Sequence, residues 1–191
     1  MALLIVGLVV FLGVHMVQAA AGGWRAGLIA RVGEGPYKGL YSGVSLAGFV
    51  LIVWGFGIAR HDTVVLWTPP GFAGAFASIL NLAALIFIGA FLAPAGRLKA
   101  AVGHPMVIGT ILWAVGHLIA NGTLADVVLF GAFLAWAAVD LVTLYARDRA
   151  AAVVRAPGPE GNDAIAAGIG IVLWGAFILF AHRWLFGVSP L

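Results

Sequence analysis

Long apolar stretches alternate along the whole chain with short polar or charged segments. About 20 consecutive apolar residues are enough for a helix to cross a bilayer. Six stretches qualify, and the segments between them leave no length for a separate water-soluble domain. They are residues 2–21, 39–59, 72–93, 105–120, 124–146 and 164–186. The pattern therefore predicts an all-α fold, in which a single transmembrane domain of residues 1–191 forms a polytopic bundle of six transmembrane helices.

Local signals refine these predicted spans. Pro105 suits the first turn of a helix, where its missing N–H has no partner in any case, and Asn121-Gly122 is typical of a helix end followed by a turn. Small residues spaced four apart, Gly39, Gly43 and Ala47, predict a face of the second span that approaches another helix closely. The proline- and glycine-rich segment within residues 147–163 predicts an exposed loop.

The distribution of basic residues predicts the orientation in the membrane. Cytoplasmic connections of membrane proteins carry an excess of Lys and Arg. Only Arg60 and Arg183 lie on one side of the predicted bundle, whereas eight cations lie in the connections after spans one, three and five: Arg25, Arg31, Lys38, Arg97, Lys99, Arg147, Arg149 and Arg155. We therefore expect the N- and C-termini on the non-cytoplasmic side. No charge precedes the first apolar stretch, which favours a retained helix over a signal peptide.

The composition agrees with a membrane protein and excludes several kinds of site. Hydrophobic residues make up 63% of the 191 residues and charged residues only 9%, against about 45–50% and about 25% in soluble domains. The chain has no Cys, which excludes thiolate metal sites, iron–sulfur clusters and Cys nucleophiles. The cations form no basic stripe, so nucleic-acid binding is not expected.

Five histidines carry most of the potential chemistry, and all lie in or beside predicted spans: His15, His61, His104, His117 and His182. Imidazole is the strongest soft-metal or haem ligand that this composition offers, and an ionisable side chain within a span usually has a functional partner. His15 lies farthest from a span end, whereas His61 fits a solvated loop. His104 and His117 lie about 20 Å apart on opposite faces of one predicted helix, so they cannot bind the same metal ion.

Depth in the membrane suggests which histidines lie at the same level. With the N-terminus outside, His15 and His104 lie toward the inner side, and His117 and His182 lie near the outer edge. The simple depth pairs are therefore His15 with His104 and His117 with His182. A pair of His15 and His117 requires a tilted or displaced first span, or a large ligand between the two rings.

Four further residues are candidates for the surroundings of a histidine site. Gln18 lies one turn after His15, and Asn121 lies one turn after His117, where it could orient the imidazole or cap the helix. Trp113 lies deep in the fourth span and could line a pocket. Asp140 lies inside the inner end of the fifth span, where a carboxylate is costly and usually paired or functional.

Motifs of soluble enzymes are missing from the sequence. It has no phosphate-binding loop, no glycine-rich nucleotide loop after a strand and no His-Glu-x-x-His zinc motif. The few carboxylates lie mostly in predicted loops, which disfavours a dimetal site rich in carboxylates. The residue pattern alone assigns no catalytic residue.

One block of the fourth span carries a resemblance to a known family. Residues 103–109 read Gly-His-Pro-Met-Val-Ile-Gly, and residues 112–122 continue Leu-Trp-Ala-Val-Gly-His-Leu-Ile-Ala-Asn-Gly. This block resembles the NnrU family of bacterial membrane proteins and the related 15-cis-zeta-carotene isomerases. Supporting matches cover most of the chain, at residues 12–15, 60–67 and 180–182. In the isomerases, further histidines occupy the fifth span, where this chain has Trp136.

The resemblance implies a haem b cofactor whose iron is bound by His15 and His117. His104 and His182, which the depth estimate favours as partners, are the alternative ligands. It also implies a multi-pass protein of the bacterial inner membrane, linked to nitrite and nitric oxide metabolism in denitrification. If the protein is an enzyme, the resemblance favours redox-switched cis–trans isomerisation of a hydrophobic polyene. Membrane lipid, a hydrophobic substrate and a denitrification reductase are the partners to expect.

Two other functions compete with this one. The first is a non-enzymatic accessory or assembly subunit for nitrogen-oxide reductases. The second is a membrane methyltransferase acting on a lipid or an isoprenoid, because residues 103–106 also resemble the Arg-His-Pro start of such enzymes. Gly103 replaces the arginine of that motif, and no later cofactor motif of those enzymes follows.

Overall fold

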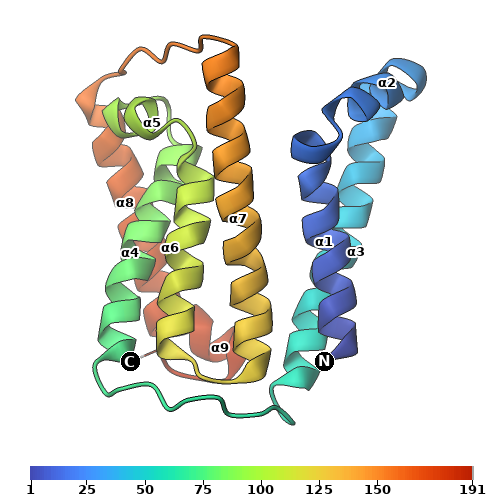
Figure 1. Cartoon of the computed structure of the whole chain (residues 1–191). Helices are drawn as coiled ribbons and strands as arrows, with labels where there is room; N and C mark the ends of the chain where they lie inside the picture. The colour runs from blue at the N-terminus through green and yellow to red at the C-terminus, as the bar shows by residue number, and fades with distance from the viewer. Residues whose placement is uncertain (191) are drawn as a thin grey trace. The chain divides into compact units, whose positions relative to one another are not determined.

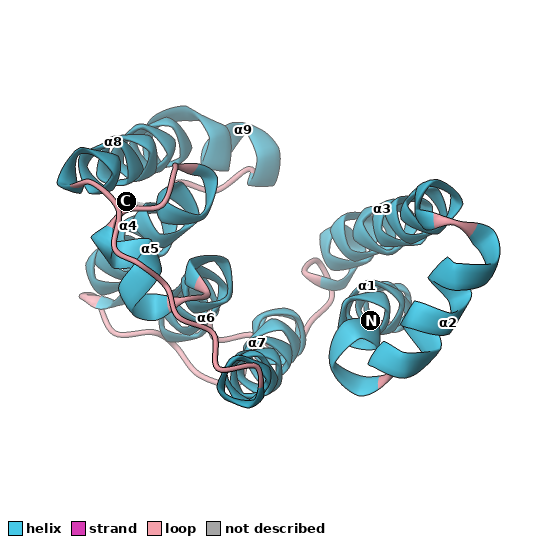
Figure 2. Ribbon diagram, turned by 90° about the horizontal axis from the view of Figure 1, so that it is seen from above, coloured by secondary structure: helices cyan, strands magenta, loops and turns pink. Residues whose placement is uncertain are grey.

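The computed structural model describes residues 1–190, except for the side chain of Gln18. Most of these residues are helical, and the one β-type pairing among them is an isolated bridge between Val65 and Thr123. The elements are α1 (Ala2–Ala20), α2 (Gly22–Val32), α3 (Glu34–Ala59), α4 (Ala73–Leu92), α5 (Arg97–Val102), α6 (Pro105–Ala120), α7 (Leu124–Ala150), α8 (Glu160–Ala176), the π-helix η1 (Phe177–Ala181) and α9 (His182–Phe186). The predicted all-α fold is confirmed (Figures 1 and 2).

Four helical segments are long and apolar enough to cross a membrane: Glu34–Ala59, Ala73–Leu92, Leu124–Ala150 and Glu160–Phe186. A fifth crossing is possible by length and composition if α1 and α2, which are bent by 83° between Ala2–Val17 and Gly22–Val32, form one broken span. The fourth predicted span corresponds to α6, which has 16 residues and is therefore about 24 Å long. The chain is thus a multi-pass membrane protein with four or five candidate spans.

The chain divides into two compact units, and the boundary lies within α7. Unit 1 contains Met1–Trp67 and Thr123–Trp136. Unit 2 contains Thr68–Gly122 and the chain from Ala137 onwards.

In unit 1, α1 and α3 pack against each other along their lengths (Figure 1). Glycines permit this close approach: a Cβ added at Gly48 would lie 2.8 Å from the backbone nitrogen of Phe11, and one at Gly7 would lie 2.6 Å from that of Ile52. The predicted packing face at Gly39 and Gly43 does not contact α1: a Cβ at either position would meet nothing within 4 Å among the described residues. α1 and α3 approach each other closely farther along α3, about one to four turns beyond Gly39 and Gly43. The glycines at these contacts are not spaced four residues apart.

The connection between α1 and α3 is helical, although the sequence predicts a loop there. Ala21 adopts φ −142° and ψ 42° between α1 and α2. Gly33, with φ +87°, ends α2, so α3 begins at Glu34 rather than at residue 39. A positive φ is readily adopted by glycine because it has no Cβ.

The beginning of α7 belongs to unit 1 and is fixed by a cap. The backbone N–H of Asp126 donates to Thr123 Oγ1 (3.3 Å), and the backbone N–H of Thr123 donates to Asp126 Oδ2 (3.1 Å). This reciprocal arrangement is a capping box, which satisfies donors at the start of a helix. The N–H of Leu124 also donates to the Val64 carbonyl (2.8 Å), and this bond ties α7 to the segment after α3.

In unit 2, α4 packs against α6 and against α8, as the view from above shows (Figure 2). Glycines on both partners face α4: a Cβ at Gly109 would lie 2.8 Å from the Ala84 carbonyl oxygen, and one at Gly170 would lie 2.5 Å from Ile86 Cα. Asp163 of α8 accepts hydrogen bonds from the backbone N–H groups of Arg97 (2.9 Å) and Leu98 (3.0 Å), and so caps α5. The last span winds as a π-helix at Phe177–Ala181, directly before His182.

Candidate functional site

His15 lies on α1 in an aromatic environment within unit 1. Its ring centroid lies 4.3 Å from that of Phe11, 5.4 Å from Tyr41 of α3 and 6.0 Å from Trp136 of α7. The Trp136 ring meets the imidazole edge-on, at an interplanar angle of 87°. Three helices therefore supply the surroundings of this one ring.

The hydrogen bond of His15 decides which nitrogen can act as a ligand. His15 Nδ1 lies 2.6 Å from the Phe11 carbonyl oxygen. A carbonyl only accepts hydrogen bonds, so Nδ1 carries the proton. In the neutral ring, Nε2 then has the lone pair. A metal-bound histidine commonly shows this arrangement, in which the second ring nitrogen donates to a backbone carbonyl and fixes the tautomer.

A pocket of about 370 Å³ lies beside His15 in unit 1. Two cations contribute to its lining. The Arg25 guanidinium lies over the Tyr37 ring, 5.3 Å from its centroid, and Lys38 pairs with Glu34 at 2.8 Å on α3. The full lining is Val14, His15, Arg25, Tyr37, Lys38 and Tyr41.

Two buried polar atoms in unit 1 have no hydrogen-bond partner among the described residues: Ser45 Oγ and Trp136 Nε1. Trp136 contacts the His15 ring, and Ser45 lies one turn after Tyr41 on α3. Buried polar groups normally have partners. The Trp136 Nε1–H, on a ring that contacts His15, is therefore available to a further group.

His117 lies in the last turn of α6, in unit 2. Its Nδ1 lies 2.8 Å from the Trp113 carbonyl oxygen, and its ring centroid lies 5.2 Å from that of Trp113. Because a carbonyl only accepts, Nδ1 of His117 also carries the proton. The side chain of Asn121 donates to the His117 carbonyl (2.8 Å), so the amide caps α6, one of the two roles expected for it.

The five histidines divide between the two units. His15 and His61 belong to unit 1, and His104, His117 and His182 belong to unit 2. The ligand pair of His15 and His117, and the depth pair of His15 and His104, therefore remain predictions. His61 is exposed at the end of α3, and His182 Nδ1 lies 2.8 Å from the Val188 carbonyl oxygen.

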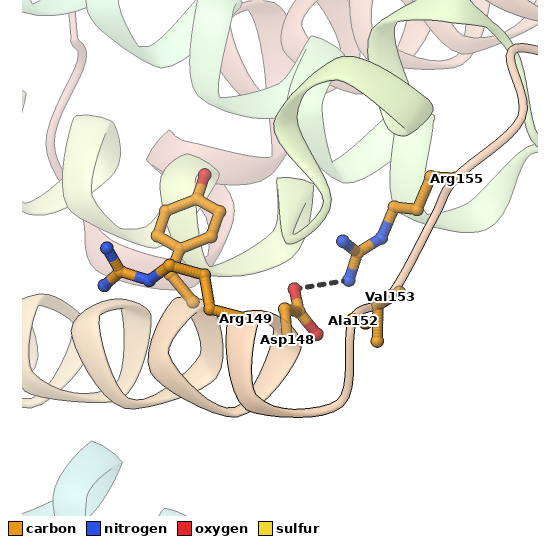
Figure 3. A pocket seen from close by; sticks show the side chains of 6 residues that line it. Asp148, Arg149, Ala152, Val153 and Arg155 are labelled. Carbon is orange, nitrogen blue, oxygen red and sulfur yellow. Dashed lines mark hydrogen bonds and ion pairs between the residues drawn. The ribbon is translucent and has the colours of Figure 1, made fainter.

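His104 has different partners from the other histidines. It is the N-cap residue of α6, and its Nε2–H donates to Asp148 Oδ2 at 2.7 Å. The same carboxylate oxygen accepts a hydrogen bond from Arg155 at 2.6 Å (Figure 3). Tyr145 packs edge-on against the His104 ring and donates its hydroxyl to the Val102 carbonyl (2.7 Å). These residues form the His104 cluster: His104, Tyr145, Asp148 and Arg155.

Two backbone turns bring the members of the His104 cluster together. Gly103 has φ +71°, and a Cβ there would lie 3.0 Å from Arg155 Cζ, so glycine gives both the turn and the space for the guanidinium. After α7, Ala152 has φ +48°, and the N–H of Val153 donates to the Asp148 carbonyl (2.9 Å). This closure of the helix end turns the chain back, so that Arg155 reaches Asp148.

The predicted exposed loop at residues 147–163 is confirmed for residues 151–159, which are non-helical and mostly exposed, and is corrected at both ends. The first residues belong to α7, and the last belong to α8. Between them, the side chain of Arg155 is only 29% exposed because it is bound at Asp148. Sequence reasoning missed Asp148 and Arg155. The one signal in the sequence that could have indicated Asp148 was its position as a single carboxylate between Arg147 and Arg149, at the inner end of a predicted span.

A second pocket, of about 390 Å³, is lined in part by residues of the His104 cluster. Figure 3 shows the side chains that line it. Asp148 lies in its wall, with Arg149 on the same helix and Arg155 on the returning segment. The complete lining is Tyr145, Asp148, Arg149, Ala152, Val153 and Arg155. The Gly-His-Pro sequence at residues 103–105 has three roles. Gly103 forms a turn, His104 caps α6 and binds α7 through Asp148, and Pro105 is the first residue of α6.

The model of the NnrU protein family matches residues 3–190. The chain belongs to the NnrU family. Searches of curated proteins and of solved structures found no match to this NnrU-family chain.

The remaining candidate residues of this NnrU-family chain are Asp140 and Gln18. Asp140 lies partly buried on α7, in unit 2. Gln18 lies on α1, but its side chain is outside the described part of the structure. Within residues 1–190, no group of three or more His, Asp or Glu side chains that could hold a metal ion is present, leaving Gln18 aside.

Proposed function

We propose that this NnrU-family protein binds haem b through His15 and His117 in the bacterial inner membrane and acts in nitrite and nitric oxide metabolism. The observation that carries the proposal is the setting of His15. An imidazole on an apolar helix donates Nδ1–H to a backbone carbonyl, is surrounded by aromatic rings and lies beside a pocket. Each of these features suits an axial ligand of haem.

The chain's own residues would then perform two tasks. The carbonyls of Phe11 and Trp113 hold the proton on Nδ1 of His15 and His117, so that Nε2 is the nitrogen presented to a metal. Aromatic side chains around His15 exclude water. Bound there, haem would supply a redox-active iron that can act as a Lewis acid, and we propose redox-switched isomerisation of a hydrophobic polyene as the activity.

We further propose six membrane crossings, with both termini on the non-cytoplasmic side. The helices from α3 to α9 then supply five crossings, of which α6 is the shortest, and α1 is the first. Eight of ten cations fall on the cytoplasmic side in this arrangement. Arg25, Lys38 and the His104 cluster then lie at the cytoplasmic surface.

The haem proposal is tested on the full-length protein purified in detergent. We expect a Soret band and a haem b spectrum after extraction into alkaline pyridine. His15→Ala and His117→Ala should each lose most of the haem, whereas His61→Ala, at an exposed position, should keep it. Wild-type protein without extractable haem, even after reconstitution with haemin, would contradict the proposal.

The proposed activity needs a separate test. Reduced and oxidised protein are incubated with a cis-polyene, and the isomers are separated by chromatography. Turnover by the reduced form alone is expected. Haem-loaded protein that shows no turnover in either state would favour the accessory-subunit function, which co-purification with a nitrogen-oxide reductase would then test.

A further inference from the structure

Two cations line the His15 pocket, and neither has a role in the proposed function. Arg25 comes from α2 and Lys38 from α3, yet both line the same pocket as His15 of α1. The bend after α1 and the positive φ of Gly33 bring these three helices together. The pocket therefore combines an imidazole, two tyrosines and two cations within unit 1.

The partners of the two cations leave them able to bind an anion. The ion pair of Lys38 with Glu34 is exposed, with 72% and 69% of the two side chains accessible, and such pairs contribute little free energy. Arg25 has no carboxylate within ion-pair distance among the described residues and instead lies over Tyr37. An anion entering the pocket would displace no strong interaction.

The combination of features indicates the chemical class of the ligand. The His15 side of the pocket is apolar and aromatic, and the cations come from helices at one end of α1. A flat apolar molecule with carboxylates along one edge matches both parts. Haem b has this character, because two propionates project from one edge of its macrocycle.

We propose that Arg25 and Lys38 bind the propionate carboxylates of the haem whose iron His15 ligates. This inference rests on the proposed haem-binding function and deepens it. Charge-assisted hydrogen bonds from guanidinium and ammonium groups to carboxylates are the strong class of such bonds. The cations therefore set the orientation of the macrocycle and contribute to its affinity.

The test compares haemin with haemin dimethyl ester, in which the carboxylates are neutral. Apoprotein in detergent is titrated with each porphyrin, and the Soret absorbance gives the dissociation constants. Wild-type protein is expected to bind haemin at least about tenfold more tightly than the ester, which corresponds to about 1.4 kcal/mol. In the double variant R25Q/K38Q, the two constants should agree within about twofold.

Arg31→Gln is the matched control, because Arg31 lies on α2 but does not line the pocket. It should keep the full preference for haemin. Equal binding of haemin and the ester by wild-type protein overturns the inference but leaves the haem proposal intact. Failure of wild-type protein to bind either porphyrin overturns the haem proposal itself.

Two further outcomes would also overturn the inference. If R25Q/K38Q weakens the binding of haemin and its ester equally, the cations support the fold and do not bind the carboxylates. If the preference of R25Q/K38Q for haemin is unchanged while its binding to phosphatidylglycerol vesicles falls, the two cations bind lipid headgroups. Preference lost in R25Q/K38Q and retained in R31Q supports the inference.

Discussion

His15 in unit 1 and His104 in unit 2 show the same side chain held by opposite ring nitrogens. The Nδ1–H of His15 donates to a backbone carbonyl, whereas the Nε2–H of His104 donates to the Asp148 carboxylate. Aromatic rings surround the first imidazole, and the second lies between a carboxylate and a guanidinium. His15 is therefore prepared to present Nε2 to a ligand, while His104 uses Nε2 to fasten α6 to α7.

The largest expected difference is in haem content. His104→Ala should retain haem at close to the wild-type level, because its Nε2 is already engaged by Asp148. His15→Ala should lose most of it. The haem-to-protein ratio of the two purified variants measures the difference directly. Loss of haem from His104→Ala, with retention in His15→Ala, would reverse the comparison and favour the His104 alternative.

Removal of the carboxylate should produce the largest loss of stability. Asp148→Ala leaves His104 and Arg155 without their shared acceptor, and we expect a loss of about 1–3 kcal/mol in the free energy of unfolding. Thermal or denaturant unfolding in detergent measures it. Arg149→Ala removes a neighbouring charge from the same pocket and should change stability by less than about 0.5 kcal/mol. Equal effects of the two variants would show that the ion pairs of Asp148 contribute nothing specific.

The turn before His104 should tolerate a methyl group poorly. Gly103→Ala places a Cβ at φ +71° and 3.0 Å from Arg155 Cζ, so we expect a loss of about 1–2 kcal/mol. Gly131→Ala, on α7, is the control, because a Cβ there meets nothing within 4 Å. That change should be neutral or stabilising by up to about 1 kcal/mol. The midpoint of unfolding should therefore fall for Gly103→Ala and stay unchanged or rise for Gly131→Ala.

The smallest expected effect is a gain. Ala152 has φ +48°, a conformation that glycine adopts without steric cost. Ala152→Gly should therefore stabilise the protein by about 0.5–1 kcal/mol, as measured by the same unfolding experiment. Destabilisation would mean that the Ala152 methyl group packs in a way that outweighs its backbone strain.

The sequence predicted the helices better than their connections. The spans at residues 72–93 and 105–120 match α4 and α6 closely, because apolar runs bounded by proline and turn signals determine them locally. The helical connection α2 and the early start of α3 were missed, because their cations and glycines resemble those of a loop. Length alone also did not separate a short apolar helix such as α6 from a full crossing.

The sequence named the candidate residues but not the partners that they have in the structure. His15, Trp113 and His117 stand out in the sequence because polar or large aromatic side chains are conspicuous in apolar runs. The partner of His104 lies 44 residues away, at Asp148, and its contact depends on the turns at Gly103 and Ala152. Those turns are products of tertiary structure, so no local signal in the sequence indicated that Asp148 and Arg155 would meet His104.

The π-helix at Phe177–Ala181 holds one more residue in its turn than an α-helix would. Because of this extra residue, every side chain after the π-helix is rotated about the helix axis by about 100° relative to uninterrupted α-helical winding. Deleting one residue from this segment would restore α-helical winding and turn His182 to another face of its span, without changing either flanking sequence.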